Sequence, residues 1–134
     1  QPIMTVARIM EIARDCAGLL KHASYRETAY QAVFGHLLKK EGYDVKLEVG
    51  VVYRLPPPDL FVFGHGRLDM LVTNTETGAE FIIELKANVR PNIQQHLGQL
   101  ARYLEHRPEK AIGILVYFSG WDSDVHHYIL DCRK

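Results

Sequence analysis

Residues 66–87, GRLDMLVTNTETGAEFIIELKA, decide the fold expected of this chain. Two largely apolar stretches, Leu68–Thr73 and Glu80–Ala87, carry β-branched and aromatic side chains of the kind that favour strands. Between them lies Asn74–Gly78, a run of residues that form turns. The pattern predicts a β-hairpin made of two core strands.

An acidic residue interrupts each strand of this hairpin. Antiparallel pairing about the centre of the turn places Asp69 opposite, or nearly opposite, Glu84, with β-carbons about 5 Å apart. Two like charges in such positions repel each other unless something compensates. Lys86 follows Glu84 by two residues and shares its face of the strand, so it offsets part of the charge. A divalent cation would offset more.

The residues alone leave two interpretations of this cluster open. A charge buried in an apolar strand is costly, so such charges are more often functional sites than accidents. The alternative is an ion pair of Lys86 with Asp69 or Glu84 on an exposed face of the hairpin, because Asp…Glu-x-Lys is a short and common pattern.

A helix is expected over residues 92–105, after a break at Asn88–Pro91. Its leucines recur on one face. The other face carries three side chains with polar groups: His96, Gln99 and Tyr103. These residues either border the acidic cluster or form an ordinary solvated face.

Two helices are expected before the hairpin. The first follows Thr5, a residue type that caps helix N-termini. The second begins near Ser24, where Glu27 completes an S-x-x-E capping box, and ends at Gly42. Glu27 also borders the apolar stripe, so it either caps the helix only or points into the site as well.

The remaining segments predict strands. Val45–Tyr53 alternates with period two and ends before Pro56–Asp59, because proline cannot donate to a ladder. Phe61–Phe63 is either a short extra strand or a packed loop. Ala111–Phe118 suits a strand buried on both faces, and Val125–Leu130 suits a last strand. The order of elements predicts an α/β fold with a mixed sheet flanked by helices.

The size and composition limit the classes of function. The chain has 134 residues, which suits one domain over residues 1–134. Lys plus Arg and Asp plus Glu both number 16, and this zero net charge counts against strong non-specific binding of nucleic acid. No apolar run reaches the roughly 20 residues that cross a bilayer, and no signal peptide is visible. Cys16 and Cys132 form no Cys-x-x-Cys pair, so a reducing compartment is expected: cytoplasmic, or nuclear in a eukaryote, and not secreted.

Motifs of several other enzyme classes are missing. The sequence has no Gly-x-Ser-x-Gly, no P-loop and no His-Glu-x-x-His. His126-His127 lies in an apolar stretch near the C-terminus, where a surface or packed pair is a better interpretation than a metal site.

Five segments, in order, resemble the motifs of the PD-(D/E)XK nuclease superfamily, and within it the small proteins named after the Gly-x-x-Glu-x-x-Tyr motif. They are Ser24–Tyr30, Gly66–Val72, Phe81–Ala87 with its Glu-x-Lys, His96–Leu104 with its His-x-x-Gln-x-x-x-Tyr-Leu, and Gly113–Phe118. The resemblance spans Ser24 to Gly120. The chain departs from the family in three respects: Ser24 replaces the motif's glycine, Leu55–His65 is longer and richer in proline and phenylalanine, and the N-terminal helix lies outside the motifs.

The resemblance implies a restriction-endonuclease-like α-β-β-β-α-β core with an extra N-terminal helix, and hydrolysis of phosphodiester bonds. It also implies a metal site made of Asp69, Glu84 and the backbone carbonyl of Leu85. These hard oxygen ligands suit Mg²⁺, with Mn²⁺ as a substitute. The expected partner is nucleic acid, with DNA as the first expectation, and not a membrane. The sequence leaves the oligomeric state open, a dimer included.

The resemblance also implies roles for the other site residues. Lys86 would orient the attacking water or stabilise developing negative charge. Gln99 and Tyr103 would position Lys86, the water or a phosphate. Glu27 would add a third carboxylate, to a second metal or through water.

Two alternatives to an active nuclease follow from the same residues. The first is a catalytically weak or inactive nuclease-fold module that binds nucleic acid or a protein partner, which suits the neutral charge and small size. The second is a structural domain with an exposed, ion-paired hairpin, which predicts neither metal binding nor activity.

Overall fold

The structure, a computed structural model, describes residues 5–21, 26–54, 63–105, 111–119 and 125–131. Its helices and strands follow one another as α1 (Val6–Leu19), α2 (Glu27–Lys40), β1 (Asp44–Arg54), β2 (Phe63–Thr73), β3 (Glu80–Ala87), α3 (Ile93–Leu104), β4 (Ile112–Phe118) and β5 (Val125–Asp131). This order contains the predicted α-β-β-β-α-β core, with α1 before it and β5 after it. No helix in the described ranges is long and apolar enough to span a bilayer.

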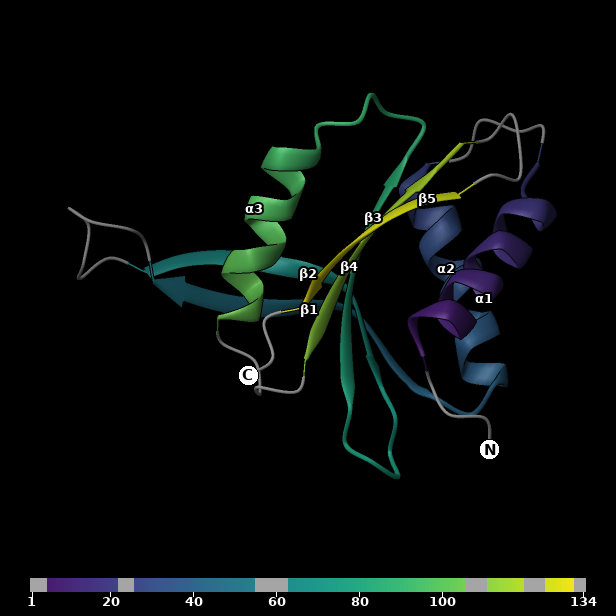
Figure 1. Cartoon of the computed structure of the whole chain (residues 1–134), viewed down its shortest axis with the longest axis horizontal. Coiled ribbons are helices and arrows are strands. Elements are labelled where there is room, and N and C mark those ends of the chain that lie inside the picture. The colour runs from purple at the N-terminus through teal and green to yellow at the C-terminus, as the bar shows by residue number, and fades with distance from the viewer. Residues whose placement is uncertain (1–4, 22–25, 55–62, 106–110, 120–124, 132–134) are drawn as a thin grey trace.

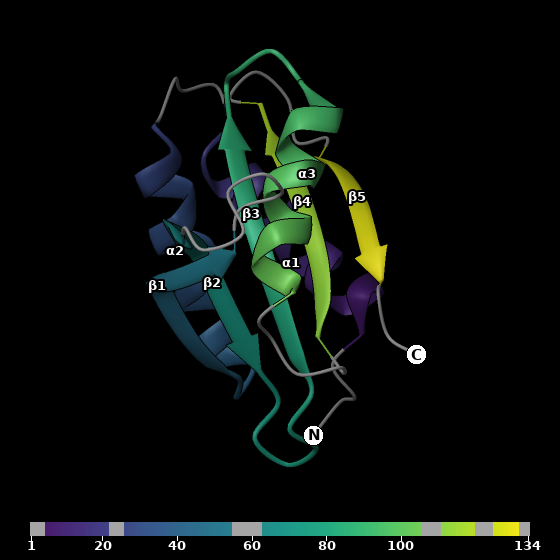
Figure 2. The same cartoon turned by 90° about the vertical axis from the view of Figure 1, so that its left-hand side faces the viewer.

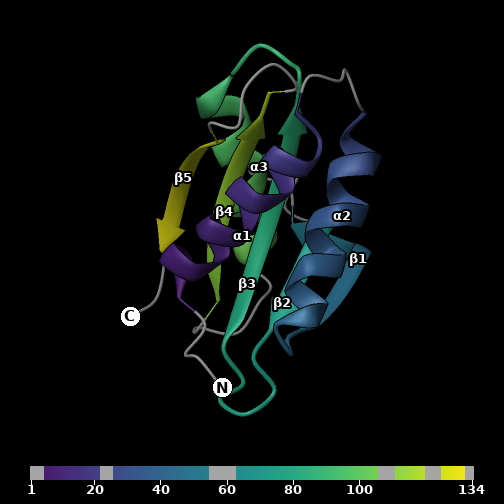
Figure 3. The same ribbon diagram turned by 90° about the vertical axis from the view of Figure 1, so that its right-hand side faces the viewer.

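The strands form one mixed sheet. Figure 1 shows the sheet between α3 on one side and α1 and α2 on the other, and Figure 2 shows the strands side by side in the order of the chain, from β1 to β5. Neighbours run antiparallel except β3 and β4, which run parallel because the chain returns between them through α3. Figure 2 shows α3 on one face of the sheet, and Figure 3 shows α1 and α2 on the opposite face. The predicted sheet flanked by helices is therefore confirmed.

The alternation of side chains along β3 decides which face carries the acidic cluster. Every second residue from Phe81 to Ala87 packs into the core under α1 and α2. Ile82 points the other way, into the core under α3. Glu84 and Lys86 share the face of Ile82, so the cluster lies on the side of the sheet that α3 covers.

The starts of the helices agree only in part with the prediction. Thr5 caps α1 as expected, since its side chain accepts a hydrogen bond from the backbone N–H of Arg8. The expected start of the second helix near Ser24 is wrong: α2 begins at Glu27, and its N-cap Arg26 makes no side-chain capping bond. Ser24 itself lies outside the described residues. Glu27 thus occupies the first helical position, where the partial positive charge of the helix N-terminus favours an acid.

β2 is longer than the predicted Leu68–Thr73, and it pairs with β1 from end to end. Its pairing runs from Asp44 with Thr73 to Arg54 with Phe63, so β2 begins before the expected Leu68. Glycines 64 and 66 disfavour a strand locally, but a long partner strand overrides that preference. The proline run, Phe61 and Val62 lie outside the described residues. Glu80–Ala87, by contrast, has the predicted bounds.

Candidate active site

β2 and β3 stop pairing where the acidic residues begin. The last pair of the ladder is Met70 with Ile83, and Asp69 and Glu84 occupy the next positions. There the backbone N–H of Leu85 donates to Oδ2 of Asp69 over 2.8 Å, and the N–H of Asp69 lies 3.4 Å from Oε1 of Glu84. The structure therefore brings the two carboxylates together, each in contact with the other strand.

Leu85 presents its backbone to this cluster and its side chain to the core. The N–H and C=O of one residue in a strand point to the same side. Since the N–H of Leu85 faces Asp69, its carbonyl oxygen faces the same gap between the strands. The side chain is only 1% exposed and packs under α1 and α2, which holds the backbone in place.

Burial acts against ionisation of both acids, and the charge of Asp69 adds to this effect at Glu84. Burial raises the pKa of Asp69, against the hydrogen bond from Leu85 and the charge of Lys86, which lower it. Burial, followed by the negative charge of Asp69, raises the pKa of Glu84 to about 8, and Lys86 only partly opposes this. The described side chains therefore do not balance two negative charges at this point.

The donor set at this point fits a hard divalent cation. Two adjacent carboxylates and a backbone carbonyl supply only oxygen atoms, which Mg²⁺ and Mn²⁺ prefer. Within the described ranges, no three His, Cys, Asp or Glu side chains gather closely enough to hold a metal ion. The oxygen groups that could hold a cation here are those of Asp69, Glu84 and the carbonyl of Leu85.

Glu27 lies at the border of the cluster. Burial raises its pKa, and the negative charge of Asp69 raises it further, whereas Lys86 and a hydrogen bond from the backbone N–H of Ala87 lower it. The side chain is half-buried at the first position of α2. The structure thus places Glu27 beside Lys86 and the end of β3, although it does not join Asp69 and Glu84 in a three-residue metal cluster.

Lys86 is the cation that these acids share. Its charge acts on Glu27, Asp69 and Glu84. It also lowers the pKa of His96 on α3, after burial of the imidazole, which is the larger cause. His96 Nδ1 lies 2.5 Å from the hydroxyl of Tyr117, the residue paired with Lys86 on β4. The sequence left open whether His96 borders the acidic cluster or a solvated face, and the structure places it beside the partner of Lys86.

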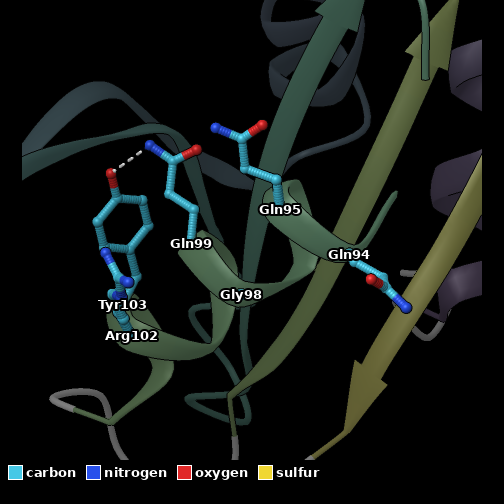
Figure 4. Close-up of a pocket in the computed structure, with 6 residues that line it drawn as sticks. All are labelled: Gln94, Gln95, Gly98, Gln99, Arg102 and Tyr103. Atoms are coloured by element: carbon cyan, nitrogen blue, oxygen red, sulfur yellow. Dashed lines mark hydrogen bonds between the residues drawn. The ribbon is translucent and has the colours of Figure 1, made fainter. Parts of the chain in front are cut away.

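Gln99 and Tyr103 form a neighbouring pair on the same helix. Nε2 of Gln99 donates to the hydroxyl of Tyr103 over 3.1 Å (Figure 4). Gln99 follows His96 by one turn, so the pair continues the site along α3.

A residue that the sequence analysis missed supports Asp69 from behind. Gln31 on α2 is 8% exposed, and its Nε2 donates to the backbone carbonyl of Asp69 over 2.6 Å. Asp69 is therefore held through its carbonyl by α2 and through its carboxylate by β3. An amide within the apolar stripe of the helix, one turn after Glu27, was the available signal.

The backbone of β1 is unusual beside Asp69. Glu48 has a φ of 52°, a left-handed conformation that is uncommon for residues other than glycine. The ladder with β2 skips the pair of Glu48 and Asp69, and resumes at Val49 with Leu68. Glu48 is exposed, lies 3.8 Å from Nη1 of Arg67, and raises the pKa of Asp69 by its charge. The distortion coincides with the position at which β2 leaves β3.

Comparisons with known proteins agree with this architecture. The sequence matches a family model described as the PD-(D/E)XK nuclease superfamily over residues 6–127. Among solved structures, one described as "Crystal structure of SSO0001" has a TM-score of 0.51 and 19% identity, over 94% of this chain and 67% of that chain. At such identity the likeness concerns the fold alone. No curated protein matches the sequence.

Proposed function

Because the chain belongs to the PD-(D/E)XK nuclease superfamily, we propose that it is a metal-dependent nuclease that hydrolyses phosphodiester bonds of nucleic acid, with DNA as the expected substrate. One observation carries the proposal. The carboxylates of Asp69 and Glu84 and the backbone of Leu85 converge where β2 and β3 part, and the charge of Lys86 acts on both acids.

The metal would be Mg²⁺, with Mn²⁺ as a substitute, held by Asp69, Glu84 and the carbonyl of Leu85. When bound, such an ion lowers the pKa of water and stabilises negative charge on a phosphate. Lys86 would contribute a fixed positive charge next to these ligands. An ammonium group there orients the attacking water or stabilises a phosphate oxygen as its charge develops.

The flanking residues would position the reacting groups. Glu27 borders Lys86 and holds a hydrogen bond from β3, so it would restrain the ammonium group and accept hydrogen bonds from ordered water. Gln99 and Tyr103 would place a phosphate or water from the side of α3, through the amide and hydroxyl that they already pair.

A nuclease-fold module without catalysis is the second candidate, and the zero net charge favours it. Such a module would bind nucleic acid or a protein partner. Calorimetric titration with Mn²⁺ separates the two candidates, because an active site binds the ion at Asp69 and Glu84 and a module that has lost catalysis need not.

The direct test is a cleavage panel. Purified protein is incubated with single-stranded, double-stranded and branched DNA and with RNA, in Mg²⁺, in Mn²⁺ and in EDTA. We expect cleavage that requires the metal and is lost in Asp69→Asn and Glu84→Gln. Lys86→Met should lower kcat by about 10²–10³-fold, the range found for removal of a charge-stabilising group.

A matched control comes from the same hairpin. Glu76 is an exposed acid in the turn, so Glu76→Gln removes a carboxylate of the same kind without touching the cluster. It should cleave like the parent protein. Metal-dependent cleavage that survives in both Asp69→Asn and Glu84→Gln would show that these residues are not the active site.

A further inference from the structure

A polar cavity opens on the exposed side of α3. Its volume is about 410 Å³, and it is lined by Gln94, Gln95, Gly98, Gln99, Arg102 and Tyr103, which we call the amide pocket (Figure 4). Figure 4 shows Gln95 and Gln99 reaching out on the same side of the helix, with the Tyr103 hydroxyl bonded to Gln99. The proposed mechanism uses only Gln99 and Tyr103 of this set.

The lining suits a nucleobase and its sugar better than a row of phosphates. Among the described residues of its lining, three are glutamines, and each amide both donates and accepts hydrogen bonds. The edges of unpaired bases offer donors and acceptors together, whereas a phosphate offers acceptors only. Arg102 belongs to the same lining, and a guanidinium group binds phosphate oxygens.

The shape of the pocket favours a base that has left its duplex. Its volume falls within the range of about 300–1,000 Å³ that is usual for small-ligand pockets, which is the scale of one nucleotide. Paired bases are read by elements that project into a groove, and a concave pocket reaches a base only when that base is unstacked. Gly98 adds room, since a Cβ there would meet no atom within 4 Å.

The pocket lies one helical turn from the neighbourhood of Lys86. His96, one turn before the pocket residue Gln99, has its Nδ1 2.5 Å from the hydroxyl of Tyr117, and Tyr117 pairs with Lys86 across β3 and β4. A nucleotide in the pocket would therefore adjoin a phosphate at Lys86 along the same strand.

We propose that the amide pocket binds an unpaired nucleotide of the substrate strand next to the scissile phosphate. The substrate class is then single-stranded nucleic acid, or the single-stranded part of a branched molecule. The inference rests on the proposed function for the identity of the neighbouring phosphate, but binding can be measured without cleavage.

The test makes the same substitution at two exposed helix glycines. Gly98→Leu places a large side chain in the pocket, and Gly18→Leu places one on α1, where an added Cβ meets no atom within 4 Å. Leucine favours helices more than glycine does, so both variants should fold. Binding of a labelled single strand and of a blunt duplex of the same sequence is measured by fluorescence anisotropy in EDTA, and cleavage is measured separately in Mn²⁺.

We expect the parent protein to bind the single strand more tightly than the duplex. Gly98→Leu should weaken binding of the single strand by about tenfold, the loss expected for one bound base, whereas Gly18→Leu should stay close to the parent. Three outcomes would contradict binding of an unpaired nucleotide in the amide pocket. They are equal affinity for single strand and duplex, equal affinity of the two variants for the single strand, and no binding at all. Preference for the single strand without any Mn²⁺-dependent cleavage overturns the nuclease and leaves the pocket standing.

Discussion

At the scale of single residues, burial of the ionised carboxylate of Glu84 lowers the stability of the folded protein. Glu84 is 3% exposed in the folded chain and lies beside Asp69, and its pKa rises from 4.5 to about 8. In the unfolded chain the carboxyl group has its ordinary value. At a pH between the unfolded and the folded pKa of Glu84, the folded protein binds more protons than the unfolded chain. The free energy of unfolding therefore falls as the pH rises through this range.

We expect the metal-free protein to lose stability between pH 5 and pH 8 on account of Glu84. The loss should be a few kcal/mol at most, since one pKa unit corresponds to about 1.4 kcal/mol. Urea unfolding in EDTA across this range measures it. Excess Mg²⁺ should remove the loss, because it binds the ionised carboxylates of the folded state.

The variant Glu84→Gln isolates this contribution. His96, whose pKa is lowered by burial and by Lys86, gives the opposite slope near neutral pH, and it is present in both proteins. The parent should therefore lose more stability than Glu84→Gln as the pH rises, and Glu76→Gln should behave like the parent. The same pH dependence in parent and Glu84→Gln would contradict the assigned burial of the charge.

Gln31 gives a second test at this scale. Gln31→Met keeps the volume of the side chain but removes the donor that holds the carbonyl of Asp69. Supporting residues of this kind usually change metal affinity by about 10–100-fold. We expect weaker Mn²⁺ binding by calorimetry, with an unchanged circular dichroism spectrum. His36→Met, at an exposed position of the same helix, is the control, and an unchanged affinity in Gln31→Met would speak against a positioning role.

At the scale of elements, α3 packs closely on the sheet because Gly113 of β4 has no side chain that would collide with it. A Cβ at Gly113 would lie 2.8 Å from Cδ2 and 2.9 Å from Cγ of Leu100, closer than real contacts allow. Leu104 lies next to the same point, at 3.0 Å. The close approach of this helix sets the position of Gln99 and Tyr103 relative to β3.

Gly113→Ala should therefore displace α3. We expect a loss of stability of about 1–3 kcal/mol, as in other overpacked cores, and a raised KM for the substrate. Denaturant unfolding and steady-state kinetics measure the two effects. Gly98→Ala on α3 itself meets open space and should stabilise the helix by roughly 1 kcal/mol. A Gly113→Ala protein as stable as the parent would contradict the packing described.

The elements also show which parts of the fold could be predicted from the sequence. β3 was predicted with its observed bounds because an apolar, β-branched run and a turn are local signals. The start of α2 was not, because the capping pattern at Ser24 suggested an earlier N-cap than Arg26. A turn marks the end of a strand in the sequence, whereas the first residue of a helix can differ by a few positions from the one that a capping pattern suggests.

The candidate site divides in the same way. The convergence of Asp69 and Glu84 could be predicted because a hairpin is local. Gln31 and His96 could not be assigned from spacing alone, since their partners lie 38 and 21 residues away. Leu85 entered only through the resemblance to a family, because no side-chain pattern reveals a backbone ligand.

At the scale of the whole molecule, the zero net charge predicts weak dependence of binding on salt. If Lys86 and Arg102 are the two cations that meet phosphates, a plot of log K against log salt for a single strand should have a slope of about −1.4. Anisotropy titrations from about 50 to 200 mM salt give this slope.

Substitutions that each remove one positive charge test which residues contribute to this slope. Arg102→Gln should make the slope shallower by about 0.7, whereas Lys40→Gln, at an exposed position near the end of α2, should leave it unchanged. A slope steeper than about −4 would mean that many more phosphates are bound than the amide pocket and Lys86 account for.

The parting of β2 and β3 also bears on how molecules of this protein behave toward one another. Beyond Ile83, the N–H groups of β3 that face β2 bond to acids instead of a strand: Leu85 to Asp69, and Ala87 to Glu27. A strand edge with open backbone groups is a template to which a second chain adds, and this leads to aggregation. The acids proposed for chemistry therefore also occupy the backbone N–H groups of this edge. Asn and Gln retain an oxygen that accepts these hydrogen bonds and Ala does not, so amide substitutions are the better probes of catalysis.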